Sequence, residues 1–401
     1  MDSLPRNCLL TINGGSSSIK YALYEIKDPL NQLLSGEIED IGNGKAKLHF
    51  IHSKGEQKNH FNIPVSNHTE AAEWLVTWLE KETEFINIKA IGHRIVQGME
   101  HTSPEKITDE LLKELKAISA YDPEHLPAEI KLIEVFRKHY PAVAQAACFD
   151  TSFHTTMPNV AKLVPIPQKY RDKGIKRYGF HGLSYAYILE EFERMEGAEK
   201  AKEKIIIAHL GSGASLVAIK NGKSKDTTMG FTPSSGLTMS TRTGDIDPGV
   251  AWHLQKFEKL TPTEFNQMVN HESGLLAISE TSGDMKKLLE IQHKDKRAAE
   301  AIDFFCYQCI KWIGAFAAVL GGLDTLIFSG GIGEHSPEIR DKIIKGIKFL
   351  GIEICTLKNL KNEAIISTAI SKATVRVIKT NEELMIAKLV CDVLNIPIRK
   401  A

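Results

Sequence analysis

Residues 13–24, NGGSSSIKYALY, bring together glycines, hydroxyls and a lysine, groups that suit phosphate oxygens. Their spacing differs from the G-x-x-x-x-G-K-[ST] loop that leads from a strand into a helix. Residues 8–12 are apolar, and Ile19, Tyr21 and Leu23 alternate with other side chains, as in a strand. We therefore predict a tight turn between two strands whose backbone N–H groups could bind phosphate. A hairpin that binds nothing would use the same glycines.

A second stretch repeats this plan about half a chain later. CLLTINGGSSSIKYAL at residues 8–23 and IIIAHLGSGASLVAI at residues 205–219 both show an apolar strand, a Gly/Ser turn and another strand. Self-similarity at that distance predicts a duplicated domain rather than a solenoid. If the two domains face each other, two phosphate-binding hairpins would line one cleft, which favours phosphate binding by the first.

Several polar residues stand where predicted strands end. Helical patterns at 69–82, 111–118 and 128–139 alternate with strand patterns at 90–92, 143–149, 204–208, 325–328 and 375–378, which predicts an α/β fold. Arg94 follows the strand at 90–92 and is expected at its carboxyl end, where ligands bind in α/β sheets. Asp150 ends the strand at 143–149, and the strand at 204–208 leads into HLGSG.

The overall composition narrows the class of partner. The chain has 401 residues, of which 42% are hydrophobic, and 50 basic side chains balance 50 acidic ones. The length predicts two or three domains. The zero formal net charge argues against nucleic acid or a membrane surface as the main partner. Residues 1–7 carry no apolar signal-peptide segment, so we expect a cytoplasmic protein.

The longest apolar segment, residues 298–320, predicts a buried helix rather than a membrane span. It contains charged residues at 300, 303 and 311, and Gly321-Gly322 would form its C-cap. Cys306 and Cys309 form the only CxxC motif, and a zinc site would need two more ligands nearby. Core packing of two thiols in a reduced protein is the favoured interpretation.

Eight motifs, in order, resemble one family across essentially the whole chain. They are NGGSSSIKY, GHRIVQG, CFDTSFH, RYGFHG, HLGSGAS, STRTGDIDPG, FSGGIGE and TNEE. They are similar to those of the acetate kinases, within the wider acetate/propionate/butyrate kinase group and the superfamily of sugar kinases, heat-shock chaperones and actin. The resemblance implies an α/β fold of two duplicated ribonuclease-H-like (actin-like ATPase) domains with a nucleotide cleft between them.

The resemblance also implies a domain plan and a reaction. Residues 1–150 plus 382–401 would form the N-terminal acyl-substrate and phosphate domain, and residues 151–381 the nucleotide-binding and dimerisation domain of a homodimer. The reaction would be direct, in-line and reversible transfer of the ATP γ-phosphoryl group to acetate, giving acetyl phosphate and ADP. Mg²⁺ would be the metal, with Mn²⁺ as an alternative. The partners would be ATP and a small carboxylic acid, without nucleic acid or membrane.

The resemblance assigns roles to individual residues. Arg94 would hold the acetate carboxylate, and Arg242 and His181 would stabilise the transferring phosphoryl group. Asp150 is the expected essential carboxylate. We assign it to orienting the metal or the attacking carboxylate, because acetate has no proton to lose near neutral pH. A salt bridge or a structural histidine would account for the same residue types.

The remaining site residues are also implied by the resemblance. Asn13 and Glu382 would bind the metal, which usually keeps several waters, while Thr380 and Glu383 have capping-box spacing. The apolar acyl wall would be Val96, Phe180 and Pro233. The nucleotide and its phosphates would contact Ser16, Ser18, Lys20, His209, Leu210, Gly211, Ser212, Gly213, Asp284, Met285, Lys286, Gly331, Ile332, Gly333, Glu334 and His335.

Several positions depart from the family pattern. Gln97, Met99, Ser212, Lys286 and His335 stand where His, Gly, Asn, Arg and Asn are usual. Residues 123–127 read PEHLP where PLHNP is frequent, so Glu124 replaces a leucine of the acyl pocket. Either Leu126 supplies the apolar wall through a shifted loop, or the acyl substrate differs. A methyl-sized difference is worth only about 1–3 kcal/mol, so acetate and propionate stay unresolved.

Three other functions remain open at this stage. The first is a propionate or butyrate kinase and the second a pyrophosphate-dependent acyl kinase, both of the same fold. The third is a chaperone-like ATPase, which would hydrolyse ATP without a carboxylic acid.

Overall fold

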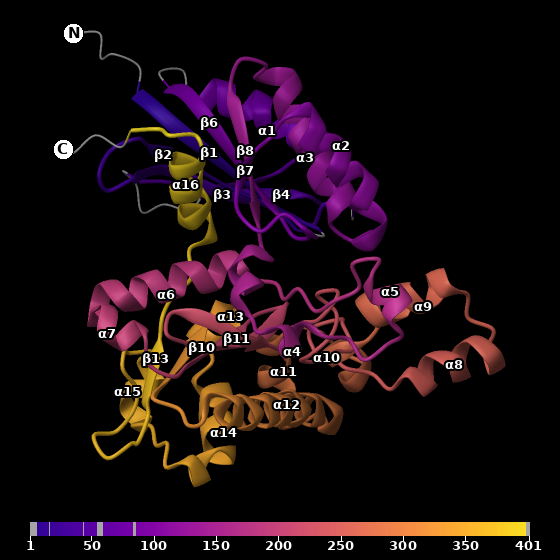
Figure 1. The fold of residues 1–401 in the computed structure, drawn as a ribbon, viewed down its shortest axis with the longest axis vertical. Helices are drawn as coiled ribbons and strands as arrows, with labels where there is room; N and C mark the ends of the chain where they lie inside the picture. The colour runs from indigo at the N-terminus through magenta and orange to yellow at the C-terminus, as the bar shows by residue number, and fades with distance from the viewer. Residues whose placement is uncertain (1–5, 16, 43, 54–58, 83–85, 398–401) are drawn as a thin grey trace. The chain divides into compact units, whose positions relative to one another are not determined.

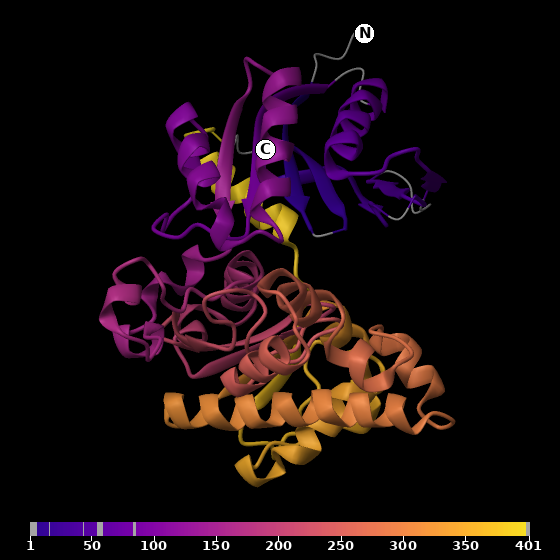
Figure 2. The same cartoon turned by 90° about the vertical axis from the view of Figure 1, so that its right-hand side faces the viewer.

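The computed structural model describes residues 6–15, 17–42, 44–53, 59–82 and 86–397. The chain divides into two compact units (Figure 1). Unit 1 comprises Met1–Ser152 and Asn381–Ala401, and unit 2 comprises Phe153–Thr380. Each unit is built on its own sheet (Figures 1 and 2).

Unit 1 contains a mixed sheet with helices on both faces. Its described strands have the order β5-β4-β3-β2-β1-β6-β8-β7. The strands are β1 (Arg6–Gly14), β2 (Ile19–Glu25), β3 (Asn31–Glu39), β4 (Lys47–His52), β5 (Asn59–Asn62), β6 (Ile86–Ile95), β7 (Glu105–Lys106) and β8 (Ala144–Phe149). The helices are α1 (His68–Glu82), α2 (Asp109–Ile118), α3 (Leu126–His139) and α16 (Glu382–Val393), with a 3₁₀ turn at Ser119–Tyr121.

Alternation along β6 shows how the faces of this sheet are covered. Ile91 packs in a core cluster with Leu132 and Phe136 of α3. The next residue, Gly92, faces α16, where a Cβ would lie 2.5 Å from the side chains of Ile386 and Val390. Successive strand residues point to opposite faces, so α3 and α16 cover opposite faces of the sheet (Figure 1).

Unit 2 has a smaller sheet and more helices. Its described strands, β9 (Ile205–Leu210), β10 (Ala214–Lys220), β11 (Lys223–Thr227), β12 (Thr325–Ser329) and β13 (Thr374–Val377), have the order β11-β10-β9-β12-β13. The first helices are α4 (Asn159–Lys162), α5 (Gln168–Arg171), α6 (Gly182–Glu196), α7 (Ala198–Ala201), α8 (Pro248–Phe257) and α9 (Pro262–His271). The others are α10 (Gly274–Ser279), α11 (Met285–Ile291), α12 (Lys296–Leu320), α13 (Gly330–His335), α14 (Pro337–Gly346) and α15 (Thr356–Leu360), with 3₁₀ turns at Ser152–Thr156 and Lys348–Leu350.

The two sheets share one plan, which confirms the predicted duplication. In unit 1, β1 pairs antiparallel with β2, β2 with β3, and β1 pairs parallel with β6. In unit 2, β9 pairs antiparallel with β10, β10 with β11, and β9 pairs parallel with β12. Both Gly/Ser turns therefore connect the first two strands of a sheet, next to its parallel part.

The long apolar helix α12 is only partly buried, which corrects the expectation of a buried helix. It packs against β9, β10, β11, α10, α11 and α14. Gly321, at φ +70°, forms the predicted C-cap, and Cys306 and Cys309 are buried free thiols. The opposite face exposes Phe304, Tyr307 and Val319. Among the described helices, α12 alone is long and apolar enough to cross a membrane by length and composition.

Three local predictions need correction. Arg94 lies within β6 rather than after it, and His209 and Leu210 lie within β9. Residues 330–335, which include predicted nucleotide ligands, form the short helix α13. The predicted capping box does not form, because Asn381 is the N-cap of α16 and its side chain accepts a hydrogen bond from the Leu384 N–H at 2.9 Å.

Candidate active site

The first Gly/Ser turn joins β1 to β2 as predicted. Asn13 pairs with Lys20 across the two strands, and the Gly15 N–H donates to the Ser18 carbonyl at 2.8 Å. A Cβ at Gly14 would lie 2.7 Å from Leu132 Cδ1 of α3, so a larger residue here would have to displace that buried side chain. The predicted ligand Ser16 lies outside the described residues. The strand pairing therefore brings Lys20 beside Asn13 at the end of the sheet.

Acidic side chains surround the ammonium group of Lys20. Desolvation of its ammonium lowers the pKa, but the carboxylates of Glu37, Glu383 and Glu382 outweigh this, so the pKa of Lys20 is raised. Lys20 is therefore positively charged at neutral pH, as a phosphate-binding lysine must be.

Arg94 connects two other predicted site residues of unit 1, Asp150 and Asn13. Its Nε and Nη2 donate to Asp150 Oδ2 at 3.0 and 2.6 Å, and its Nη1 donates to Asn13 Oδ1 at 3.2 Å. Asp150 is fully buried. Burial alone would lower the pKa of Arg94, but Asp150 and Glu382 raise it, and the net direction is upward. The guanidinium is therefore held charged and oriented at the end of β6.

The first residues of α16 complete this group. Asn13 Nδ2 donates to Glu382 Oε2 at 2.9 Å and to Glu383 Oε1 at 3.2 Å. Burial and the neighbouring Glu382 raise the pKa of Glu383. The described residues contain no cluster of three His, Cys, Asp or Glu side chains suited to a metal ion. Asn13 and Glu382 thus offer oxygen atoms but no closed metal cage.

The acyl-pocket positions of unit 1 bear on whether Leu126 supplies the apolar wall in place of the leucine that Glu124 replaces. Val96 is buried, and Glu124 is half-buried. Leu126 is fully buried in a core cluster with Ile95 and Phe149. Leu126 is therefore a core residue, and the idea that it replaces the missing pocket leucine is not supported.

His181 is held beside the second Gly/Ser turn in unit 2. It is the N-cap of α6 with φ +59°, and its Nδ1 lies 2.8 Å from Ser215 Oγ. Ser215 also forms a hydrogen bond with the hydroxyl of the buried Tyr185. A Cβ at Gly213 would lie 3.3 Å from His181 Nε2. The Nδ1 side of the ring is thus anchored, and Nε2 faces the turn.

His209 lies on the same side. Its ring centroid is 4.7 Å from that of His181, and it pairs with Ser215 across β9 and β10. Leu210 is fully buried in β9 and contributes to the core rather than to an open site.

Arg242 lies on a loop that is bonded to the second turn. The Ser240 N–H donates to the Ser212 carbonyl at 3.1 Å, and the Met239 N–H donates to the Arg242 carbonyl at 3.0 Å. The half-buried side chain of Arg242 points its Nη1 to the Pro233 carbonyl at 3.4 Å. Arg242, Pro233 and Ser212 therefore belong to one connected loop system.

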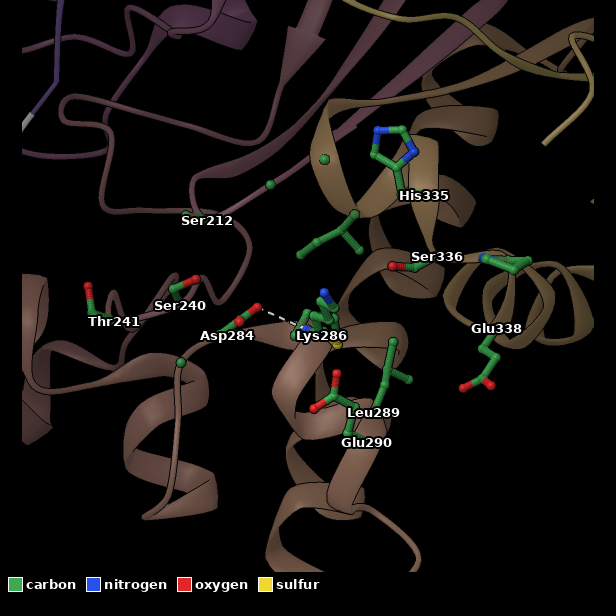
Figure 3. A pocket seen from close by; sticks show the side chains of 16 residues that line it. Ser212, Ser240, Thr241, Asp284, Lys286, Leu289, Glu290, His335, Ser336 and Glu338 are labelled. Carbon is green, nitrogen blue, oxygen red and sulfur yellow. Dashed lines mark hydrogen bonds between the residues drawn. The ribbon is translucent and has the colours of Figure 1, made fainter. Parts of the chain in front are cut away.

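A cavity of about 990 Å³ opens beside this loop system. Figure 3 shows Ser212, Ser240 and Thr241 on one side, His335 and Glu338 on the other, and Lys286 between them. Of the predicted nucleotide ligands, the lining includes Gly211, Ser212, Asp284, Met285, Lys286, Gly331, Ile332 and His335. It does not include His209, Leu210, Gly213, Gly333 or Glu334.

Sequence reasoning missed part of the lining. The additional residues are Ser240, Thr241, Gly283, Leu289, Glu290, Ser336, Pro337 and Glu338. Leu289 and Glu290 follow Lys286 by one helical turn on α11, so helical spacing could have found them. Ser336-Pro337 was a further signal, because a polar residue before a proline is typical of the start of a helix. Asp284 is also a helix cap, accepting from the Lys286 N–H at 3.0 Å (Figure 3).

Two buried charged side chains, Glu334 within α13 and Arg340 on α14, form hydrogen bonds with the backbone of α13. Glu334 Oε1 accepts from the Gly330 N–H at 2.9 Å. Arg340, fully buried, donates to the Gly333 and Glu334 carbonyls at 2.7 and 3.0 Å and to Asn359 Oδ1 at 2.7 Å. Burial lowers the pKa of Arg340 to about 10. Glu334 is therefore turned into the protein rather than toward the cavity.

The predicted apolar wall is divided between the units. Val96 belongs to unit 1, whereas Phe180 and Pro233 belong to unit 2. Phe180 is 1% exposed, and its carbonyl accepts from His154 Nε2 at 2.9 Å.

Comparison with known proteins gives one consistent family. The model of the acetokinase family matches residues 8–388. The chain is 42% identical over 391 residues to the acetate kinase of Thermoanaerobacterium thermosaccharolyticum, covering 95% of this chain and 97% of that relative. It is 40% identical over 390 residues to the acetate kinase of Rickettsia felis, covering 96% and 98%.

Solved structures agree with these relatives. A propionate kinase from Francisella tularensis superposes with a TM-score of 0.89 at 35% identity, covering 96% of this chain and 98% of that one. The acetate kinase of Porphyromonas gingivalis gives a TM-score of 0.85 at 35% identity, covering 97% and 100%.

Proposed function

Because the chain belongs to the acetokinase family, we propose that it transfers the γ-phosphoryl group of ATP to acetate. A carboxylate oxygen of acetate attacks the γ-phosphorus, the bond to the ADP oxygen breaks, and ADP leaves with its electron pair. The reverse reaction makes ATP from acetyl phosphate. The observation that carries the proposal is the guanidinium of Arg94, charged and oriented by Asp150 and Asn13.

Arg94 is the proposed carboxylate ligand. Its hydrogen bonds to Asp150 and Asn13 occupy the Nε hydrogen and one N–H on each terminal nitrogen. One N–H on each terminal nitrogen is then available, which suits a bidentate bond to acetate. Asp150 acts by orienting Arg94, since the acceptor is already ionised and needs no base.

Mg²⁺ is the proposed metal, with Asn13 and Glu382 as its protein ligands. The oxygen atoms of an amide and a carboxylate fit a hard cation that keeps waters and phosphate oxygens as its other ligands. This donor set is too small for an all-protein cage among the described residues. Bound there, the metal would neutralise charge on the phosphate oxygens.

His181 and Arg242 are the proposed stabilisers of the transferring phosphoryl group. An anion must approach an anion, so the protein has to supply N–H donors and positive charge. His181 Nε2 faces the turn at Gly213, and Arg242 lies on the loop bonded to Ser212.

The cavity of unit 2 is the proposed nucleotide site. Lys286, Leu289 and Ile332 provide a mixed polar and apolar lining suited to an adenosine group. A pyrophosphate donor would need no such cavity, so its presence favours ATP as donor.

The preferred acyl substrate is inferred from related proteins. Relatives named acetate kinase and a structural neighbour named propionate kinase both resemble the chain. We propose acetate as the main acceptor and propionate as a weaker one, because one methylene changes binding by only about 1–3 kcal/mol.

We further propose a homodimer in the cytoplasm. The apolar face of α12 at Phe304, Tyr307 and Val319 is exposed and suits a second copy of the chain. The six cysteines are free, as in a reducing compartment.

The test is acyl-hydroxamate formation with ATP, Mg²⁺ and acetate, propionate or butyrate. The wild type should prefer acetate, and Arg94→Ala should raise the KM for acetate while leaving the KM for ATP nearly unchanged. Arg137→Ala, which removes a surface arginine from the same unit, is the control. No hydroxamate from any acid would overturn the proposal, and a clear preference for butyrate would overturn the choice of acetate.

A further inference from the structure

Glu129 is a buried acid next to the acyl site that the proposed reaction does not use. It lies in the first turn of α3 and is 2% exposed. Its carboxyl oxygens lie 3.2 and 3.1 Å from the backbone nitrogen of Val96, two residues after Arg94. A Cβ at Gly14 would lie 3.8 Å from Glu129 Cγ. The side chain therefore underlies both the end of β6 and the first Gly/Ser turn.

The hydrogen bonds around Glu129 favour an uncharged carboxyl group. Two nearby nitrogen groups interact with other carboxylates instead of with Glu129. Arg94 is bonded to Asp150, and His125 Nδ1 lies 3.0 Å from Asp122 Oδ1. Within the described residues, the Val96 N–H is the one donor that reaches Glu129. A fully buried carboxylate that shares a single N–H between two oxygens would be poorly compensated.

The net effect of burial and of the charged groups facing Glu129 also favours the uncharged form. Burial first and then Asp122, from the turn before α3, raise its pKa well above the usual value, and Asp150 at the end of β8 adds to this. Arg94 on β6 and the Val96 N–H act in the opposite direction but do not outweigh burial. The neutral form therefore persists at a pH where an exposed glutamate is ionised.

Resting on the proposed function, we propose that Glu129 is a positioning residue for the acyl carboxylate. Its uncharged carboxyl group holds the Val96 backbone, and thereby Arg94, in place without adding a negative charge where an anionic substrate must bind. Once ionised, Glu129 repels the incoming carboxylate and competes for Arg94. Acetate affinity should therefore fall on the alkaline side in a way that depends on this residue.

The experiment compares wild type, Glu129→Gln and Glu129→Ala from neutral to alkaline pH. Acetate binding is measured directly by titration of ¹³C-acetate followed by NMR, and KM and kcat are measured in parallel. Glu129→Gln keeps an oxygen for the Val96 N–H but cannot ionise. It should bind acetate like wild type at neutral pH and lose less affinity as the pH rises.

Glu129→Ala removes the anchor itself. It should weaken acetate binding at every pH, by roughly tenfold if Arg94 shifts by a fraction of an ångström. Glu110→Gln, which removes an exposed acid of the same unit, is the matched control and should follow wild type. Equal alkaline losses in wild type and Glu129→Gln would overturn the inference, as would normal acetate binding by Glu129→Ala.

A stability measurement does not depend on turnover. The folded protein retains the Glu129 proton to higher pH than the unfolded chain, so wild type should lose stability relative to Glu129→Gln as the pH rises above the ordinary glutamate range. Urea unfolding in a Trp252→Phe/Trp312→Phe background leaves Trp74 and Trp78 as reporters of unit 1. A pH-independent difference would overturn the inference. Glu129-dependent acetate binding without any acyl phosphate would overturn the proposed function alone.

Discussion

Glu334 Oε1 accepts a hydrogen bond from the backbone N–H of Thr380 at 3.2 Å. The same oxygen accepts from the Gly330 N–H at the start of α13. Thr380 is the last residue of unit 2, and its hydroxyl is paired with that of Ser184 on α6 at 2.9 Å. One carboxylate therefore ties the short helix beside the cavity to the segment that leads into α16.

Replacing Glu334 with alanine should weaken both nucleotide binding and stability. Two backbone N–H groups would lose their acceptor, at a cost of about 1–3 kcal/mol for each one left buried without a partner. ADP titration calorimetry should show a several-fold loss of affinity, and urea unfolding a lower midpoint. Glu363→Ala, at an exposed acid of the same unit, is the control. Unchanged ADP affinity in Glu334→Ala would show that the cavity does not depend on this bond.

Arg340→Met should destabilise unit 2 more than most substitutions. The arginine satisfies the carbonyls of Gly333 and Glu334 and the side chain of Asn359. Methionine fills a similar space but donates nothing, so unfolding should become easier by on the order of 3 kcal/mol. Chemical denaturation measures this, and Arg340→Lys should recover only part of the loss because it lacks the forked geometry. Wild-type stability in Arg340→Met would contradict the structural role.

Gly213→Ala tests the placement of His181. The new Cβ would lie 3.3 Å from Nε2, so the ring must move or the turn must open. A displacement of a few tenths of an ångström should lower kcat by about tenfold when the group acts on the reacting atoms. Steady-state kinetics should show the loss mainly in kcat. Gly314→Ala, where a Cβ meets nothing within 4 Å, is the control, and a normal kcat in Gly213→Ala would remove His181 from the mechanism.

His93 should make the protein less stable in acid. Burial lowers its pKa from 6.5 to about 4, with an opposing contribution from the hydrogen bond to Gln145. Between these values the unfolded chain binds a proton that the folded protein does not, so stability falls as the pH falls. The total effect is about 3 kcal/mol. Urea unfolding at several pH values should show a smaller acid loss in His93→Gln, and an identical slope would contradict it.

Local patterns predicted much of the fold, and the reasons are specific. The alternation at Ile19, Tyr21 and Leu23 predicted the β1–β2 hairpin because one face of β2 is buried continuously. The boundary at Arg94 was missed because the polar residues His93 and Arg94 looked like the end of a strand. Pairing of β6 with β1 and β8 extends that strand to Ile95.

The site was less accessible to sequence reasoning than the fold. Motifs placed Arg94, Asp150 and Asn13, which the structure joins through hydrogen bonds. Glu334 was misplaced because a GGIGE motif does not reveal which way a side chain turns. Glu129 escaped notice because one glutamate on an amphipathic helix is usually solvated, and only tertiary packing buries it.

The crossing of the chain between its units has a consequence for synthesis. After β8 the chain passes into unit 2, where α6 packs on the β9–β12 sheet, and after β13 it passes back, where α16 covers β6. The part of unit 1 that precedes unit 2 in the chain therefore keeps an apolar sheet face without its cover until α16 has been translated. A chain that stops after Thr380 lacks both that cover and Glu382. Prematurely terminated products would thus expose this apolar face to chaperones and proteases.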